Sequence, residues 1–251
     1  MASDSPTRSS TTDADGLGRH LQTLGAVVSV VAGAFIVAAV FVALGAGALR
    51  PLGLTQEDAL GRVLISSFQF VGFILTAAAY FSLRDDWDLL GLRTPTARDL
   101  GWMAAGLVAL VGLLFASSFV YELTALQPAE SALVQFGQDQ PAFFLYLVPM
   151  TLLLVGPAEE LVFRGVVQGT LHREYGPWPG LVGASAIFAL IHWSSYVGEG
   201  RVVTLATIFV LGGLLGYLYL RTENILVPAV AHGLFNAVQF LWEYASVTGL
   251  V

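Results

Sequence analysis

Long apolar stretches, separated by short polar segments, dominate the chain from about residue 24 onward. Each stretch approaches or exceeds the ~20 residues that a helix needs to cross the hydrocarbon core of a bilayer. The pattern predicts an all-α polytopic membrane protein with about seven transmembrane helices, and an eighth span stays open. The expected spans cover residues 24–49, 59–83, 100–123, 141–172, 181–196, 202–220 and 225–244.

The first 23 residues differ from the rest, because they are rich in Ser, Thr and Asp and offer almost no apolar surface to bury. Such a composition predicts a disordered tail. The apolar run 24–49 is longer than the 7–15-residue core of a signal peptide and its flank is not basic, so we interpret it as the first span. Residues 24–251 are then expected to form one transmembrane domain.

Composition narrows the classes of function. The 251 residues are 56% apolar, carry a formal net charge of −7 and include no cysteine. The absence of cysteine excludes disulfides, thiolate nucleophiles and thiolate-bound metals. Most of the acidic residues fall in the tail and loops, which argues against nucleic acid as a partner. The expected surroundings are the lipid bilayer of the cell membrane.

Arginines are distributed unevenly between the two predicted sides of the membrane. Basic residues favour the cytoplasmic side, so the asymmetry predicts a cytoplasmic N-terminus and, with seven spans, an external C-terminus. The predicted cytoplasmic segments carry Arg8, Arg19, Arg84, Arg93, Arg98, Arg173 and Arg221, and the opposite side carries Arg50, Arg62 and Arg201.

Two carboxylates and a guanidinium stand inside an otherwise apolar span: Glu159, Glu160 and Arg164. A charge near the bilayer centre costs about 2.5–3.5 kcal/mol or more, so this cluster indicates a functional site. Glu160 and Arg164 lie four residues apart and can pair on one helix face, whereas Glu159 lies about 100° round the helix without a helical partner. The alternative is a plain helix start after a Gly156–Pro157 break, where acids suit the first turn.

Three more polar residues fall within later spans. At about 1.5 Å per helical residue, Glu159 and His192 lie roughly 20 and 17 Å from the cytoplasmic side, and His232 and Asn236 roughly 10 and 16 Å. A carboxylate beside a neutral imidazole can hold and deprotonate a water for attack on a carbonyl. His232 and Asn236, on one helix face, can donate hydrogen bonds to the oxyanion that develops. These residue types predict a hydrolase.

Three motifs follow one another on separate spans: Glu159-Glu160-x-x-x-Arg164, Phe188-x-x-x-His192 and His232-x-x-x-Asn236. Together they resemble the CPBP family of intramembrane proteases (CAAX prenyl proteases and bacteriocin-processing, or Abi, proteins), over about residues 89–239. The resemblance implies that Glu159 is the catalytic glutamate and that His192 helps to bind the attacking water. It also implies that His232 and Asn236 stabilise the oxyanion, and that Glu160 and Arg164 support the site.

The predicted function is therefore an intramembrane endopeptidase that cleaves a membrane-proximal bond, in a peptide precursor or in a prenylated C-terminus of the CAAX type. A proton- or ion-coupled transporter is the alternative, although the chain lacks the paired broken-helix repeats typical of transporters. A non-catalytic scaffold or immunity protein is a third, disfavoured because no motif residue is missing. No cofactor is expected; zinc held by Glu159, His192 and His232 is the metallo-type alternative.

Overall fold

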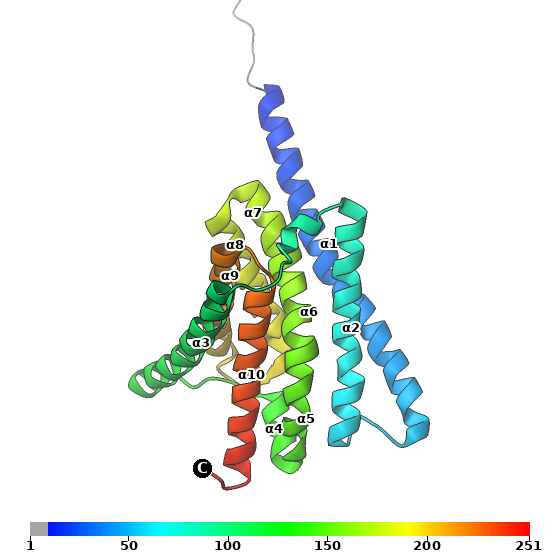
Figure 1. Ribbon diagram of the computed structural model, residues 1–251, viewed down its shortest axis with the longest axis vertical. Helices are drawn as coiled ribbons and strands as arrows, with labels where there is room; N and C mark the ends of the chain where they lie inside the picture. Colours follow the sequence, from blue (N-terminus) through cyan, green and yellow to red (C-terminus); the bar gives the residue numbers. More distant parts are fainter. Residues whose placement is uncertain (1–9) are drawn as a thin grey trace, which may run out of the picture.

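The computed structural model describes residues 10–251, which fold into a bundle of helices with one short pair of strands. Figure 1 shows α1 and α3 at the outside of the bundle and α6 and α10 near its centre. The all-α prediction is confirmed. The α-helices are α1 (Ser10–Leu49), α2 (Ala59–Arg84), α3 (Ala97–Thr124), α4 (Ala132–Asp139), α5 (Ala142–Met150), α6 (Gly156–Glu160), α7 (Gly169–Tyr175), α8 (Pro177–Ile191), α9 (Arg201–Thr222) and α10 (Leu226–Val247).

The remaining elements are short. Two π-helical segments, η3 (Thr151–Val155) and η4 (Leu161–Gln168), join α5, α6 and α7, and 3-10 turns are η1 (Arg50–Leu52), η2 (Trp87–Leu90) and η5 (His192–Ser195). Strand β1 (Glu130–Ser131) pairs antiparallel with β2 (Tyr196–Val197), with Glu130 opposite Val197. The pair ties the α3–α4 connection to the chain that follows α8.

Five stretches of the described chain are long and apolar enough to cross a membrane, judged by length and composition. The chain is an integral membrane protein. The predicted count of seven spans is not confirmed, because α8 has fifteen residues, about 22 Å of helix, and α10 contains polar residues along its length. The five stretches are Gly16–Leu52, Ala59–Arg84, Ala97–Thr124, Ala142–Tyr175 and Arg201–Thr222.

The N-terminal segment differs from its prediction. Helix α1 begins at Ser10, so residues 10–23 are helical rather than disordered, and residues 1–9 lie outside the described residues. Tertiary contacts explain the difference: His20 Nδ1 lies 2.8 Å from a carboxylate oxygen of Glu174, and the His20 ring stacks on Tyr175. With 40 residues, α1 is about 60 Å long and projects beyond the rest of the bundle (Figure 1).

The chain from Ala142 to Tyr175 forms one continuous helical stretch of 34 residues, longer than a bilayer requires, as predicted. Its α-helical turns alternate with η3 and η4. Pro149 and Pro157 cannot donate to the preceding turn, and a wider π-helical turn accommodates the lost bond. Because the helix runs through Gly156 and Pro157, the expected break there is absent. Glu159 therefore lies in mid-helix, and a plain helix start does not account for it.

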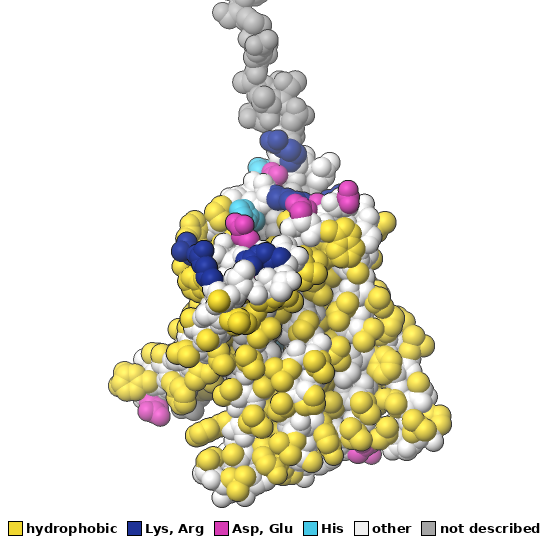
Figure 2. Space-filling view, in the orientation of Figure 1, with side chains coloured by type: hydrophobic (Ala, Val, Ile, Leu, Met, Phe, Trp, Pro, Cys, Tyr) yellow, Lys and Arg dark blue, Asp and Glu magenta, His cyan; other side chains and the backbone are white. Residues whose placement is uncertain are grey.

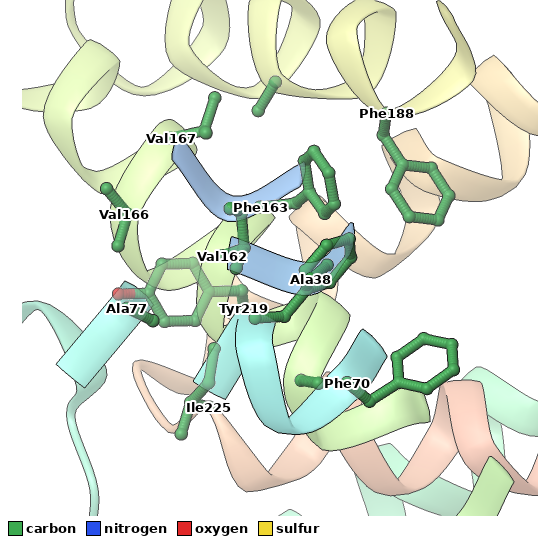
Figure 3. Packing of buried hydrophobic residues seen from close by; sticks show 14 of the residues in the cluster. Ala38, Phe70, Ala77, Val162, Phe163, Val166, Val167, Phe188, Tyr219 and Ile225 are labelled. Atoms are coloured by element: carbon green, nitrogen blue, oxygen red, sulfur yellow. The ribbon is translucent and has the colours of Figure 1, made fainter. Parts of the chain in front are cut away.

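A hydrophobic cluster around η4 holds this helix in the middle of the bundle (Figure 3). Four apolar side chains of η4 are almost completely buried and meet residues of α1, α2, α8 and α9 in the same cluster. Apolar packing around η4 thereby holds the polar residues of α6 and η4 in place. The η4 residues are Val162, Phe163, Val166 and Val167, and their partners include Ala38, Phe70, Ala77, Phe188 and Tyr219.

Charged side chains on the face seen in Figure 2 gather mainly at the end of the molecule from which α1 projects. There Arg173 pairs with Asp86 and Asp88 of the α2–α3 connection. The same connection is bound to the α9–α10 turn, since Ile225 N donates to the Leu90 carbonyl at 3.0 Å and Arg93 donates to the Thr222 carbonyl at 2.9 Å. Loops predicted to share the cytoplasmic side thus lie together.

Candidate active site

Helix α6, between the two π-helical segments, carries both carboxylates of the first motif. Glu160 and Arg164 are fully buried, and Arg164 Nε lies 3.0 Å from Glu160 Oε2, so the pair predicted from the i,i+4 spacing is present. The N–H is not aimed closely enough at the oxygen to make a hydrogen bond, and the contact is an ion pair. π-Helical turns within α-helices are frequent at functional sites, which agrees with this position.

Helix α10 brings His232 against both carboxylates. His232 Nδ1 lies 3.0 Å from Glu160 Oε1, and its Nε2 lies 3.9 Å from Glu159 Oε2. Helices α6 and α10 can come this close because Gly156 has no side chain: a Cβ at this position would lie only 2.6 Å from the Ala229 carbonyl oxygen. The result is a buried line of ionisable groups in the order Arg164, Glu160, His232, Glu159.

Phe188 of α8 connects the second motif to this line. Its ring meets His232 edge-on at 6.0 Å between centroids, and Arg164 Cζ lies 4.9 Å from its centre. The His192 ring is tilted against it at 4.6 Å. His192 lies in η5 rather than within a helix, because α8 ends at Ile191, five residues before the predicted end of the span at Tyr196. Its Nδ1 bonds the Phe188 carbonyl at 2.7 Å.

Asn236 lies one turn beyond His232 on α10 and is half-buried. The Gln239 amide approaches its Oδ1 at 3.5 Å. Among residues 10–251 no hydrogen bond joins Asn236 or His192 to Glu159. The structure therefore brings Glu159, Glu160, Arg164 and His232 into direct contact, and reaches His192 through Phe188.

The contact between Glu160 and His232 was not predicted from the sequence. The two residues are 72 positions apart, and nothing in their spacing signals that α10 packs against α6. The i,i+4 spacing assigned Glu160 to Arg164, and His232 was grouped with Glu159, His192 and Asn236 but not with Glu160. The structure adds that Glu160 touches both Arg164 and His232.

A metal site does not form from the three candidate ligands. Across the described part of the chain, no group of three or more His, Asp and Glu side chains is arranged to hold a metal ion. Glu159 and His232 face each other, but His192 does not complete a set with them. The donor set as folded does not fit the three protein ligands of a catalytic zinc.

Comparison with known proteins points to one family. Residues 141–238 match the family model described as type II CAAX prenyl endopeptidase Rce1-like, and this region contains all six candidate site residues. The uncharacterized protein YpbD of Bacillus subtilis (strain 168) is 37% identical over 86 residues, which are 34% of this chain and 40% of that protein. No solved structure matches the chain. The resemblance seen in the three motifs is confirmed for this region, which is less than half of the chain.

Proposed function

From the Rce1-like match of residues 141–238, we propose that this chain is an intramembrane endopeptidase. One observation carries the proposal: the buried line formed by Arg164, Glu160, His232 and Glu159. Charges within a membrane domain are costly, and a structural ion pair would need only Glu160 and Arg164. Glu159 is the additional carboxylate. Its carboxylate makes no hydrogen bond within residues 10–251, so the carboxylate oxygens are available to a water or a substrate.

Charge balance indicates how the four groups share a proton. The two glutamates carry two negative charges and Arg164 carries one positive charge, so a proton on His232 makes the cluster neutral. A neutral cluster is less costly to bury than a charged one. In this state His232 Nδ1–H donates to Glu160, and Nε2–H points to the side on which Glu159 lies. An N–H in that position suits an oxyanion formed beside Glu159.

In the proposed reaction Glu159 removes a proton from a water, whose oxygen attacks the carbonyl carbon of the scissile peptide bond. His192, held at Nδ1 by the Phe188 carbonyl, binds that water through Nε2. The carbonyl oxygen becomes an oxyanion that accepts hydrogen bonds from His232 and from the Asn236 amide. The tetrahedral intermediate then breaks its C–N bond, and Glu159 gives the proton to the leaving amine. Glu160 and Arg164 orient His232.

The proposed substrate is a peptide bond close to the membrane surface, in a prenylated C-terminus or a peptide precursor. The family name supports the first, because the matched model is that of CAAX prenyl endopeptidases. Two synthetic peptides of one sequence, one farnesylated on a cysteine and one unmodified, separate the two substrates in a proteoliposome assay. Preference for the farnesylated peptide supports CAAX-type processing.

The function is tested with Glu159→Gln, which keeps the shape of the side chain and removes the base. We expect peptide hydrolysis to fall by about 10²–10⁴-fold, the usual contribution of a general base, with an unchanged unfolding temperature. Glu174→Gln, on the same helical stretch but outside the site, serves as the matched control. Hydrolysis by Glu159→Gln at the wild-type rate would refute the proposed role. A wild-type protein that binds but never cleaves peptides would favour a non-catalytic or transport function.

We propose further that the site works without a metal. The expected result is substoichiometric zinc in the purified protein and full activity after exhaustive chelation. One tightly held zinc per chain, lost together with activity and restored by added zinc, would overturn this and make His232 a ligand.

The proposed orientation keeps the N-terminus in the cytoplasm, on the arginine asymmetry of the loops. Reporter fusions at each end of the chain measure it. Both reporters on one side would show that the number of spans is even.

A further inference from the structure

Three glycines of α9 face three polar side chains that are fully buried. A Cβ added to Gly212 would lie 3.8 Å from Arg164 Nη2, one on Gly213 would lie 3.9 Å from Ser185 Oγ, and one on Gly216 would lie 2.6 Å from Gln168 Oε1. Arg164, Ser185 and Gln168 each have no exposed surface. We call these three side chains the buried polar cluster. A Cβ on Gly212 would also lie 3.1 Å from Phe188 Cδ1, so the glycines let α9 approach this cluster closely.

The buried polar cluster has more hydrogen-bonding atoms than protein partners. Gln168 Nε2 donates to the Gly216 carbonyl at 3.0 Å and Ser185 Oγ donates to the Leu181 carbonyl at 2.7 Å. Arg164 Nη1, Arg164 Nη2 and Gln168 Oε1 have no hydrogen-bond partner among residues 10–251. Buried polar atoms in folded proteins are nearly always paired, with water where no protein group is available. These atoms indicate a bound partner.

The mixture of donors and acceptors identifies the partner. Arg164 offers N–H donors, whereas Gln168 Oε1 and the lone pairs of Ser185 Oγ accept. An anion would meet the two acceptors unfavourably, and the charge of Arg164 is already balanced by Glu160 at 3.0 Å. A cation would be repelled by the guanidinium. Water both donates and accepts, so it suits all three groups.

We propose that Arg164, Gln168 and Ser185 bind buried water against the glycine face of α9, and that this water supplies Glu159. The second half rests on the proposed peptidase function. Each hydrolysis consumes one water, yet Glu159 and His232 are 7% and 6% exposed in an apolar domain. Arg164 touches Glu160, the neighbour of Glu159, and Gln168 lies one turn further along η4, next to α7, whose Arg173 pairs with Asp86 and Asp88 at the charged end. The buried polar cluster thus lies between that end and the site.

Water binding is tested by radiolytic hydroxyl labelling, in which bound water modifies the side chains beside it. Leu181 is the reporter, because its Cγ would lie 3.2 Å from a Cβ on Gly216. Leu110, buried among apolar side chains of α3, α9 and α10, is the control reporter. We expect labelling of Leu181 and not of Leu110 in the wild-type protein, and a several-fold loss of Leu181 labelling in Gln168→Leu. If Gln168→Leu does not fold, Ser185→Ala, which adds no volume, should show the same loss of Leu181 labelling.

The labelling experiment tests the water site independently of peptidase activity. Unlabelled Leu181 in the wild type, or labelling that neither variant reduces, would overturn the water site even in an active peptidase. Labelled Leu181 in a protein that never cleaves peptides would refute the proposed function and leave the water site standing.

Supply of water to Glu159 is tested by kinetics in the same variants. We expect Gln168→Leu to lower kcat about tenfold with KM unchanged, because substrate contacts are intact and only bound water is lost. Gly112→Ala on α3, where an added Cβ meets no atom within 4 Å, should match the wild type. Loss of Leu181 labelling without any fall in kcat would overturn the supply role, and a rise in KM alone would show a packing effect instead.

Discussion

Helices α1 and α3 differ from the helical stretch Ala142–Tyr175 and from α9 in what surrounds them. All are apolar enough to span a membrane, but only 17% of the residues in an apolar 18-residue segment of α1 or of α3 are buried, against 44% in the other two. The less buried helices carry no ionisable residue in contact with the site. The two less buried helices are also the more apolar, with a mean hydropathy of 2.8 and 2.2 against 1.6 and 2.0. The higher apolarity therefore marks the helices that face lipid, and the more buried helices are those that can hold polar groups.

The glycines of α1 and of the helical stretch Ala142–Tyr175 also differ in what surrounds them. A Cβ added to Gly25, Gly33 or Gly47 of α1 would meet no atom within 4 Å, so these glycines are not required for packing. A Cβ on Gly156 would meet backbone atoms of α10 at 2.6 and 3.0 Å. Gly45 of α1 also packs closely, since a Cβ there would lie 2.4 Å from the Phe68 ring of α2. Glycine is therefore dispensable at the open positions of α1 and structural where helices meet.

The largest effect is expected for Glu160→Gln, which leaves Arg164 as an unpaired buried charge. Removing one partner of a buried pair costs about 3–5 kcal/mol, so the unfolding temperature and the yield should both fall sharply. Glu122→Gln, on the exposed surface of α3, is the matched change and should leave stability unchanged. Thermal unfolding in detergent measures both. Equal stability of the two variants would remove the contrast between inner and outer helices.

The next effect concerns catalysis and compares two histidines. His232→Ala should lower kcat by about 10²–10³-fold, the usual loss for one oxyanion donor. His172 is exposed on α7, and His172→Ala should keep kcat close to the wild-type value. Steady-state kinetics on the cleaved peptide measure both. A His232→Ala variant with normal kcat and raised KM would move His232 from the reaction to substrate binding.

A smaller effect is expected for Gly156→Ala, which places a methyl group against the backbone of α10. Overpacking of this kind costs about 1–3 kcal/mol, and it should also separate Glu160 from His232 and reduce activity. Gly33→Ala on α1 adds the same methyl group to open surface and should not destabilise the protein. Parallel unfolding and activity measurements separate the two. Tolerance of Gly156→Ala would mean that α6 and α10 do not need to approach so closely.

The smallest effect is expected for His20→Ala, at the contact between α1 and α7. The partner Glu174 is partly exposed and His20 is about half exposed, so the pair should contribute less than about 1 kcal/mol. The expected result is wild-type activity with a slight, salt-dependent loss of stability. A large loss of activity would show that the projecting part of α1 affects the site.

Local patterns were predicted well because they depend on neighbouring residues. The spacing of Glu160 and Arg164 on one helix predicted their ion pair. Each of the seven apolar stretches contains a helix, although residues 192–196 lie beyond the end of α8 and helix α4 was not predicted. The contact of Glu160 with His232 was not predictable, since it depends on how α10 packs against α6. The helical start at Ser10 was missed for the same reason, because His20 finds its partner on α7.

Span number and helix type were also beyond the sequence pattern. The end of α8 at Ile191 leaves that helix shorter than a bilayer and puts His192 in a 3-10 turn, although the residues up to Tyr196 do not signal the change. The π-helical turns of η3 and η4 were missed because residue periodicity over five to eight positions hardly separates them from an α-helix.

The separation of Glu160 and His232 along the chain sets an order of events during biosynthesis. The ion pair of Glu160 with Arg164 is local and forms as soon as this helix is inserted, whereas His232 is translated 72 residues after Glu160. Until α10 enters the membrane, Glu159 has no imidazole opposite it, and the α2–α3 connection has no α9–α10 turn to bind. During insertion into the membrane, the site of a nascent chain is therefore incomplete, because its two carboxylates are present before His232. The proposed peptidase would become active only once the bundle has closed around it.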